Sequence, residues 1–264
     1  MLRERVITGI IAIPVLTSVI FYSPALLAIF TCAVITIAMK EYYNMEKLPL
    51  KIDFKIFAGF SFILCYFALK NNFLFFNIFF IVLLASSGII RVLHREKTNN
   101  NYFLLTSFGN IYITYFFAHL LFLRNIPGLG AKYVFFIFLL VWITDTAAYF
   151  IGVNYGKHKL APAISPNKTI EGAVAGITGA VLITLLARPA FVPAFTIIQC
   201  FIIGIIFSVI AQMGDLFESA LKRKAGIKDS GNLIPGHGGV LDRFDSLFFT
   251  IPGFYYYVKL VLER

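Results

Sequence analysis

Apolar stretches of about twenty residues recur along the whole chain, separated by short polar segments. A helix needs about 20 mostly apolar residues to cross the hydrocarbon core of a bilayer. The stretches are apolar on all sides and do not alternate as membrane barrel strands do. Only 14% of the 264 residues are charged, whereas a soluble domain has about 25%. We therefore predict an all-α polytopic membrane protein.

Nine such stretches predict about nine transmembrane helices within one integral membrane domain, 1–264. In that domain we expect 1–130 to form membrane scaffold and 131–264 to carry the active site. The first stretch has the features of a signal peptide, but a second follows at once, so we predict a retained first span. The predicted spans are 6–22, 24–40, 54–69, 73–90, 103–123, 133–153, 172–188, 191–213 and 246–262.

The distribution of basic residues predicts the orientation. With nine spans, seventeen of the 23 Lys and Arg residues fall on the side of the N-terminus, which the positive-inside rule makes cytoplasmic. The formal net charge of +10 is spread among short segments, so membrane topology accounts for most of it and no nucleic-acid partner is expected. Each of the three cysteines lies inside an apolar run, which predicts neither a disulfide nor a metal motif.

A first polar segment begins inside the sixth span, at Asp145. An ionisable group at that depth costs on the order of 3 kcal/mol unless it meets water or a partner, and a packing role beside a cation of the bundle is the alternative. The loop that follows contains 156–159 and 165–169, with the sequences GKHK and SPNKT. Hydroxyl, N–H and ammonium groups hold phosphate oxygens, although a basic loop can also simply contact anionic headgroups.

A second polar segment begins where the eighth span ends. If that helix continues, one face carries Gln212, Asp215, Ser219 and Lys222. Glycines and a proline between 231 and 239 then predict a loop that can approach a ligand closely. Asp242 and Asp245 follow the loop, and capping of the last helix is an alternative role for Asp245.

The two ends of this excursion suggest a metal site. Asp215 and Asp242 are both close to the membrane in sequence, so the loop can bring them together, and a divalent cation relieves the repulsion of two carboxylates. Hard oxygen ligands beside basic residues favour Mg²⁺ with a polyphosphate over zinc. His237, a lone histidine among glycines, fits a phosphate contact or a proton donor.

The run SALKRKAGIKDSGNLIPGHGGVLDRFD, 219–245, resembles the signature of the phosphatidate cytidylyltransferases, and the segment 145–172 is similar to that family as well. The resemblance implies a nucleotidyltransferase of phospholipid biosynthesis that makes CDP-diacylglycerol and pyrophosphate from CTP and phosphatidate. It implies a multi-pass protein of the inner plasma membrane, in contact with membrane lipid, with its active site on the cytoplasmic face. A second, monovalent cation and a homodimer are compatible with the resemblance.

The resemblance also implies roles for individual residues. Metal coordination falls to Asp215 and Asp242, with Asp145 and Asp245 as further candidates. Lys222 and Arg223 join the two main aspartates as catalytic candidates. The candidate contacts to phosphate or substrate are Ser165, Lys168, Ser219, Lys228, Asp229, His237 and Arg243.

Two other readings remain open at this point. A CTP-dependent lipid-alcohol kinase, of the dolichol or phytol type, would also be polytopic and basic. A secondary transporter would use Asp145 as an ion site, although it predicts broken helices in corresponding positions of two halves.

Overall fold

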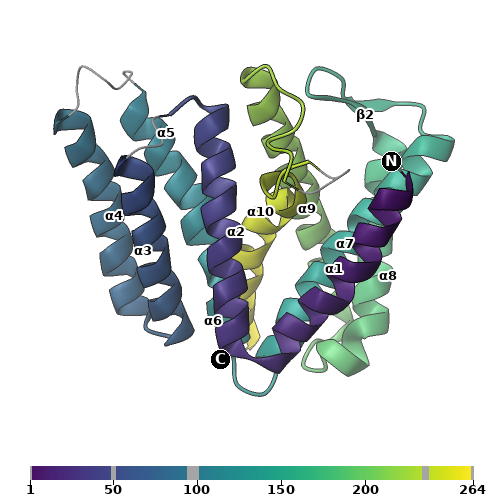
Figure 1. Ribbon diagram of the computed structural model, residues 1–264. Helices are drawn as coiled ribbons and strands as arrows, with labels where there is room; N and C mark the ends of the chain where they lie inside the picture. Colours follow the sequence, from purple (N-terminus) through teal and green to yellow (C-terminus); the bar gives the residue numbers. More distant parts are fainter. Residues whose placement is uncertain (1, 49–51, 94–100, 234–237, 263–264) are drawn as a thin grey trace. The chain divides into compact units, whose positions relative to one another are not determined.

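The computed structural model describes residues 2–48, 52–93, 101–233 and 238–262, which are mostly helical (Figure 1). The helices are α1 (Leu2–Tyr22), α2 (Pro24–Met45), α3 (Ile52–Leu69), α4 (Phe73–Leu93), α5 (Tyr102–Gly109), α6 (Phe116–Arg124), α7 (Gly130–Tyr155), α8 (Ile170–Phe191), α9 (Ile197–Lys224) and α10 (Leu241–Tyr257). Two π-helical segments, η1 (Asn110–Tyr115) and η2 (Val258–Leu262), continue neighbouring helices. Strands β1 (Lys159–Ala161) and β2 (Ser165–Thr169) form an antiparallel pair.

Each of the nine predicted spans overlaps a helical segment of the described residues. Within those residues, six helical segments are long and apolar enough to cross a membrane: 24–45, 73–93, 102–124, 130–155, 170–191 and 197–224. Shorter apolar helices cover 12–22 and 54–69. The chain is thus a multi-pass helical membrane protein, as its composition predicts.

The chain divides into two compact units. The first unit contains residues 1–125 and 229–243, and α2 is its central helix because it packs against α1, α3 and α6. Large aromatic side chains fill its interior, among them Tyr42, Phe57, Phe76 and Phe117. The hydroxyl of Tyr42 donates to the carbonyl of Leu105 at 3.0 Å, which satisfies a buried polar group.

The second unit contains residues 126–228 and 244–264, and its helices α7, α8 and α9 pack against one another. Small residues four positions apart form the face of α8 that meets its neighbours: Gly172, Gly176 and Ala180 are all buried. A Cβ atom on Gly172 would lie 2.6 Å from the carbonyl oxygen of Ala148 on α7. Small residues at this spacing let two helix backbones approach closely in a membrane.

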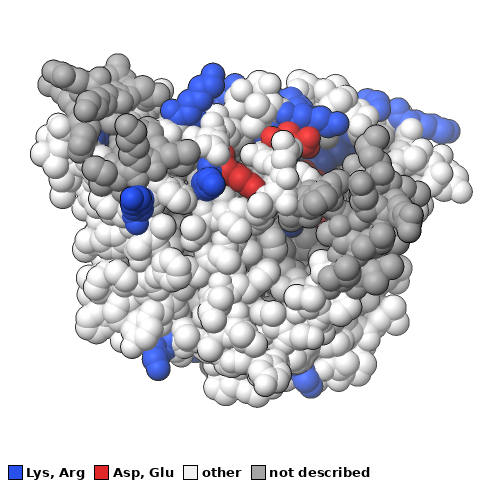
Figure 2. Space-filling model, in the orientation of Figure 1, with Lys and Arg blue, Asp and Glu red and all other residues white. Residues whose placement is uncertain are grey.

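Large apolar side chains are exposed along these helices, as a lipid-facing surface requires. Val92 is 76% exposed, Leu186 is 75% exposed and Ile198 is 71% exposed. Figure 2 shows that the Lys, Arg, Asp and Glu side chains of this face gather towards the helix ends, and the middle of the face is almost uncharged. The cysteines Cys32, Cys65 and Cys200 are buried free thiols.

Three local boundaries differ from the sequence prediction. Residues 159–169 form a short hairpin where a loop was expected. Helix α9 starts at Ile197, later than the predicted 191, because Thr196 and Gln199 form a capping box. Helix α10 starts at Leu241 instead of 246, so Asp242 and Asp245 lie inside it and Asp245 does not cap it.

Candidate active site

The end of strand β2 brings a lysine to an aspartate of α9. Thr169 follows β2 and caps α8, because its hydroxyl oxygen accepts the backbone N–H of Gly172 at 3.2 Å. This cap fixes the chain direction at the preceding residue, Lys168. The ammonium of Lys168 lies 2.7 Å from Oδ2 of Asp215, and both side chains are about two-thirds to three-quarters buried. Two segments separated by more than forty residues therefore meet in one ion pair.

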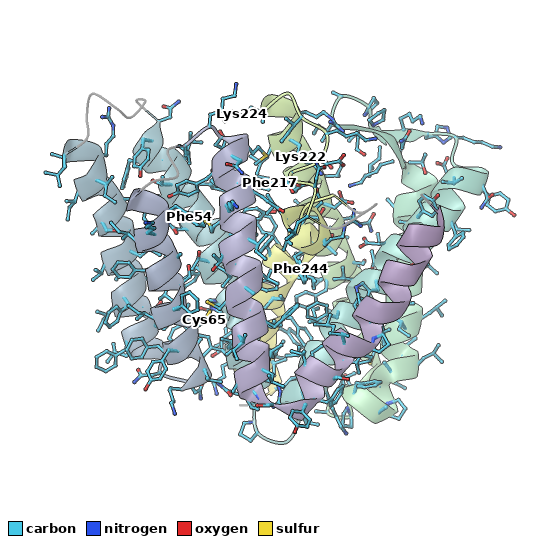
Figure 3. The ribbon with its side chains drawn as sticks, viewed as in Figure 1. Phe54, Cys65, Phe217, Lys222, Lys224 and Phe244 are labelled. Carbon is cyan, nitrogen blue, oxygen red and sulfur yellow. The ribbon has the colours of Figure 1, made fainter. Side chains whose placement is uncertain are left out.

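Helix α9 continues to Lys224 and carries the predicted polar face. The hydroxyl of Ser219 lies 3.4 Å from Oδ1 of Asp215. Lys222 pairs with Glu218, one turn earlier, at 2.5 Å. The carboxylate of Glu218 is fully buried, and the sequence analysis did not single it out. Figure 3 shows Lys222 and Lys224 at the same end of α9.

Asp245 lies within electrostatic range of three other acidic groups of the second unit. The carboxyl of Asp245, in α10, experiences the charges of Asp215, Glu218 and Asp145. Asp145 is exposed on α7 and Asp245 is half-buried. Nearby like charges repel one another unless cations offset them. The ammonium groups of Lys168 and Lys222 do so in ion pairs with Asp215 and Glu218.

The hairpin is anchored at both ends by polar contacts. Arg223 donates from Nε to the carbonyl of Ile164 at 3.2 Å and from Nη1 to the carbonyl of Ile227 at 2.9 Å. Its guanidinium thus ties the hairpin turn to the end of α9. On the other side, Glu171 accepts the backbone N–H of Lys157 and contacts Nδ1 of His158 at 2.6 Å.

Asp242 belongs to the first unit and closes a loop. Its Oδ2 accepts the backbone N–H of Ser230 at 2.9 Å and that of Gly239 at 2.8 Å. Both donors come from the glycine-rich segment, so this carboxylate joins the two ends of the loop. Glu41 of α2, another residue that the sequence analysis missed, binds the same segment. It follows Lys40 immediately beyond the predicted second span, where a charged residue is ordinary.

The other predicted site residues are more accessible. Ser165 is half-buried on β2, and three residues are exposed: Lys228, Asp229 and Arg243. His237 lies outside the described residues. Within the part of the chain that the structure describes, no group of three or more His, Cys, Asp or Glu residues could hold a metal ion by itself.

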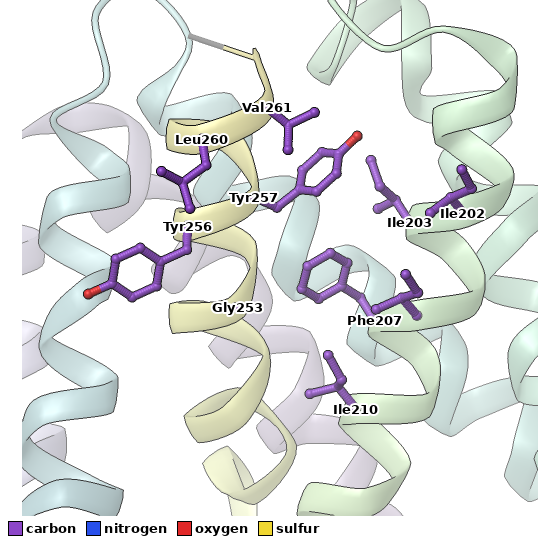
Figure 4. Close-up of a pocket in the computed structure, with 10 residues that line it drawn as sticks. Ile202, Ile203, Phe207, Ile210, Gly253, Tyr256, Tyr257, Leu260 and Val261 are labelled. Atoms are coloured by element: carbon purple, nitrogen blue, oxygen red, sulfur yellow. The ribbon is translucent and has the colours of Figure 1, made fainter. Parts of the chain in front are cut away.

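An apolar cavity of about 280 Å³ lies between α9 and α10 in the second unit (Figure 4). Its lining includes Ile203 and Phe207 from α9 and Gly253 and Tyr257 from α10. The rings of Phe207 and Tyr257 meet edge to face with centroids 6.4 Å apart. The lining contains no Asp, Glu, Lys, Arg or His side chain.

Comparison with known proteins matches residues 3–261 to the cytidylyltransferase family. The chain is 36% identical to the phosphatidate cytidylyltransferase of Bacillus subtilis (strain 168) over 267 residues, which cover 98% of each chain. It is 34% identical to that of Staphylococcus haemolyticus (strain JCSC1435) over 251 residues, 95% of this chain and 96% of the relative. Identity to that of Staphylococcus aureus (strain COL) is 36% over 253 residues, with the same two coverages.

Proposed function

Because the chain belongs to the cytidylyltransferase family, we propose that it is a phosphatidate cytidylyltransferase. A phosphate oxygen of phosphatidate attacks the α-phosphorus of CTP, the bond between that phosphorus and the bridging oxygen breaks, and pyrophosphate leaves. The product is CDP-diacylglycerol. The observation that carries the proposal is the ion pair of Lys168 and Asp215. It joins the segment 145–172 to α9, the helix that leads into the segment 219–245.

The acidic residues of the second unit suit a divalent cation. Asp215, Asp145 and Asp245 offer hard carboxylate oxygens, and the charges of Asp215 and Asp145 act on Asp245. Mg²⁺ is usually bound by one or two carboxylates together with substrate phosphates and water, so a ready-made cluster of three protein ligands is not required. Following the family resemblance, we assign the ion to Asp215 and Asp242, with Asp145 and Asp245 as further candidates. Held by these residues, Mg²⁺ would neutralise charge on the triphosphate and on the leaving pyrophosphate.

The basic residues bind and orient the phosphates. Lys168 on the hairpin is paired with Asp215 through a flexible side chain, so its ammonium can turn to a triphosphate oxygen once the aspartate binds a cation. Ser219, which contacts Asp215, and Ser165, on the same strand as Lys168, offer hydroxyl donors. Lys222 and Arg223 add positive charge at the end of α9, where charge develops on the phosphoryl oxygens. We assign Lys228, Asp229, His237 and Arg243 to the loop and the nucleotide.

We further propose nine spans in one membrane domain with a cytoplasmic N-terminus, because the six long apolar segments and the shorter helices together match the predicted spans. The basic segments 157–168 and 222–228 then face the cytoplasm, where CTP is available. The membrane is the bacterial inner membrane. Cysteine accessibility to a membrane-impermeant thiol reagent, with single cysteines introduced at Arg3 and Arg264, tests this orientation.

The reaction is tested with CTP labelled on either the α- or the γ-phosphate, using the purified chain, phosphatidate vesicles and Mg²⁺. We expect the α-label to enter the lipid fraction and the γ-label to leave as pyrophosphate. A lipid-alcohol kinase would transfer the γ-label instead, and a transporter would transfer neither. Absence of α-label from lipid in folded protein would contradict the proposal.

A further inference from the structure

Glu41 is a buried carboxylate on α2, only 6% exposed. It binds three donors of the segment 230–241. Its Oε1 accepts the backbone N–H of Val240 at 3.0 Å, and its Oε2 accepts the N–H of Leu241 at 2.7 Å and the hydroxyl of Ser230 at 3.1 Å. These partners lie about 190 to 200 positions away in sequence. Both carboxylate oxygens are thus used by one distant segment.

Two of these donors are the N–H groups at the start of α10. The first N–H groups of a helix have no partner within it, and a side-chain oxygen of the preceding residue usually satisfies one of them. Val240, which precedes α10, has no such oxygen. Glu41 supplies the missing acceptor from another helix, and its negative charge is favourable at the positive end of the α10 dipole.

The loop is built to admit this carboxylate. A Cβ atom on Gly231 would lie 2.7 Å from Oε1 of Glu41, and one on Gly239 would lie 2.5 Å from Oε2. Real Cβ atoms essentially never approach another atom so closely. A Cβ atom at either position would therefore displace the Glu41 carboxylate from its donors or move the loop away from it.

Glu41 and Asp242 share the same loop base. Ser230 donates its hydroxyl to Glu41 and its backbone N–H to Asp242. Gly239 donates to Asp242, and the next two residues donate to Glu41. The position of Asp242 is therefore coupled to Glu41 through Ser230 and the start of α10.

We propose that Glu41 is a positioning residue that holds the base of the 230–241 loop and thereby orients Asp242 for Mg²⁺ and nucleotide. The consequence for the reaction rests on the proposed function, whereas the anchoring of the loop does not. Residues that orient a ligand of a metal typically affect metal affinity or activity by about 10- to 100-fold. Glu41 does so without touching the substrate.

The test compares Glu41→Gln, Glu41→Asp and the full wild-type chain. Glutamine keeps the shape but turns one acceptor into a donor, which faces an N–H or hydroxyl donor. In hydrogen exchange without substrate or metal, we expect Glu41→Gln to speed exchange in peptides covering 229–243 and to leave α8 peptides unchanged. We expect kcat to fall about 10- to 100-fold and the Mg²⁺ concentration for half-maximal rate to rise about tenfold. Glu41→Asp keeps the charge, so we expect its hydrogen exchange, kcat and Mg²⁺ dependence to lie between those of Glu41→Gln and the wild type.

Glu46→Gln is the matched control, because it neutralises an acid at the C-terminal end of the same helix; we expect wild-type exchange in 229–243. Ser230→Ala removes one hydrogen bond to Glu41 and should give the same changes to a smaller degree, about threefold in rate. If Glu41→Gln fails to fold, Ser230→Ala tests the same contact. In the double variant, the second change should add less than it does alone.

Unchanged exchange in both Glu41→Gln and Ser230→Ala would overturn the proposal. An equal fall in kcat in Glu41→Asp and Glu41→Gln, with hydrogen exchange faster throughout the protein, would also overturn it. The residue would then serve only general packing. If the wild type transfers no label to lipid, the proposed function fails, but the exchange measurements still test whether Glu41 holds the loop.

Discussion

In the unit of residues 126–228 and 244–264, Asp215 and Glu218 pair with lysine ammonium groups, whereas in the other unit Glu41 and Asp242 bind backbone N–H groups. A backbone N–H is fixed by the fold, so a carboxylate that leaves it exposes a buried donor that has lost its acceptor. A lysine ammonium sits on a flexible stem and can exchange partners. The carboxylates that bind backbone N–H groups define the shape of a loop. The carboxylates paired with lysines carry charge that can be redistributed when a cation and a triphosphate bind.

The largest expected effect concerns Asp215. Asp215→Asn removes one charge from the acidic group and from the pair with Lys168, so we expect transfer of α-label to lipid to fall by about 10³-fold. Hydrogen exchange in 229–243 should stay as in the wild type, because the backbone N–H groups at the two ends of the loop bind Asp242 and Glu41 instead. A variant with activity within threefold of wild type, or one with an unfolded loop, would break the comparison.

The buried pair of Lys222 and Glu218 should govern stability. Lys222→Met leaves the fully buried carboxylate of Glu218 without this partner, which we expect to destabilise the protein by about 3 kcal/mol. Chemical denaturation in detergent measures the loss. Adding Glu218→Gln should recover most of it, and Lys224→Met, two residues further at the exposed end of α9, should change stability little. If the double variant is no more stable than Lys222→Met, the pair does not explain the loss.

Lys168 provides a test of exchange between partners. Without its ammonium, Asp215 is left to bind a cation directly, while the triphosphate loses a positive contact. We therefore expect Lys168→Met to raise the KM for CTP by about tenfold and to tighten Mn²⁺ binding in the absence of nucleotide, measured by electron paramagnetic resonance. Lys157→Met, in the same hairpin region but exposed, is the control. Weaker Mn²⁺ binding in Lys168→Met would show that the lysine supports the metal site instead of competing with it.

The sequence predicts the helical positions well because apolar runs of membrane length are unambiguous. It also predicts the polar face of α9, since Gln212 to Lys222 obey helical spacing. It does not predict that α10 starts at Leu241, because the acceptor for its first N–H groups comes from Glu41, about 200 residues earlier. Glu218 was missed for a similar reason: its burial depends on how α9 packs, and a glutamate four residues before a lysine is ordinary on an exposed helix.

Glu171 provides the smallest and most discriminating prediction, because it lies in the second unit but binds backbone N–H groups. Its carboxylate accepts the N–H groups of Lys157 and His158, and His158 is 74% exposed. If the kind of partner decides the role of a carboxylate, Glu171→Gln should loosen the hairpin 157–169 in hydrogen exchange, as Glu41→Gln loosens its loop. Because water competes for these exposed donors, we expect only about a threefold loss of activity. Glu171→Asp and His158→Ala separate the contributions of the backbone and ring contacts. A large loss of label transfer to lipid, with unchanged hydrogen exchange in the hairpin, would mean that Glu171 acts on the substrate directly. The unit in which a carboxylate lies would then determine its role more than the group that it binds.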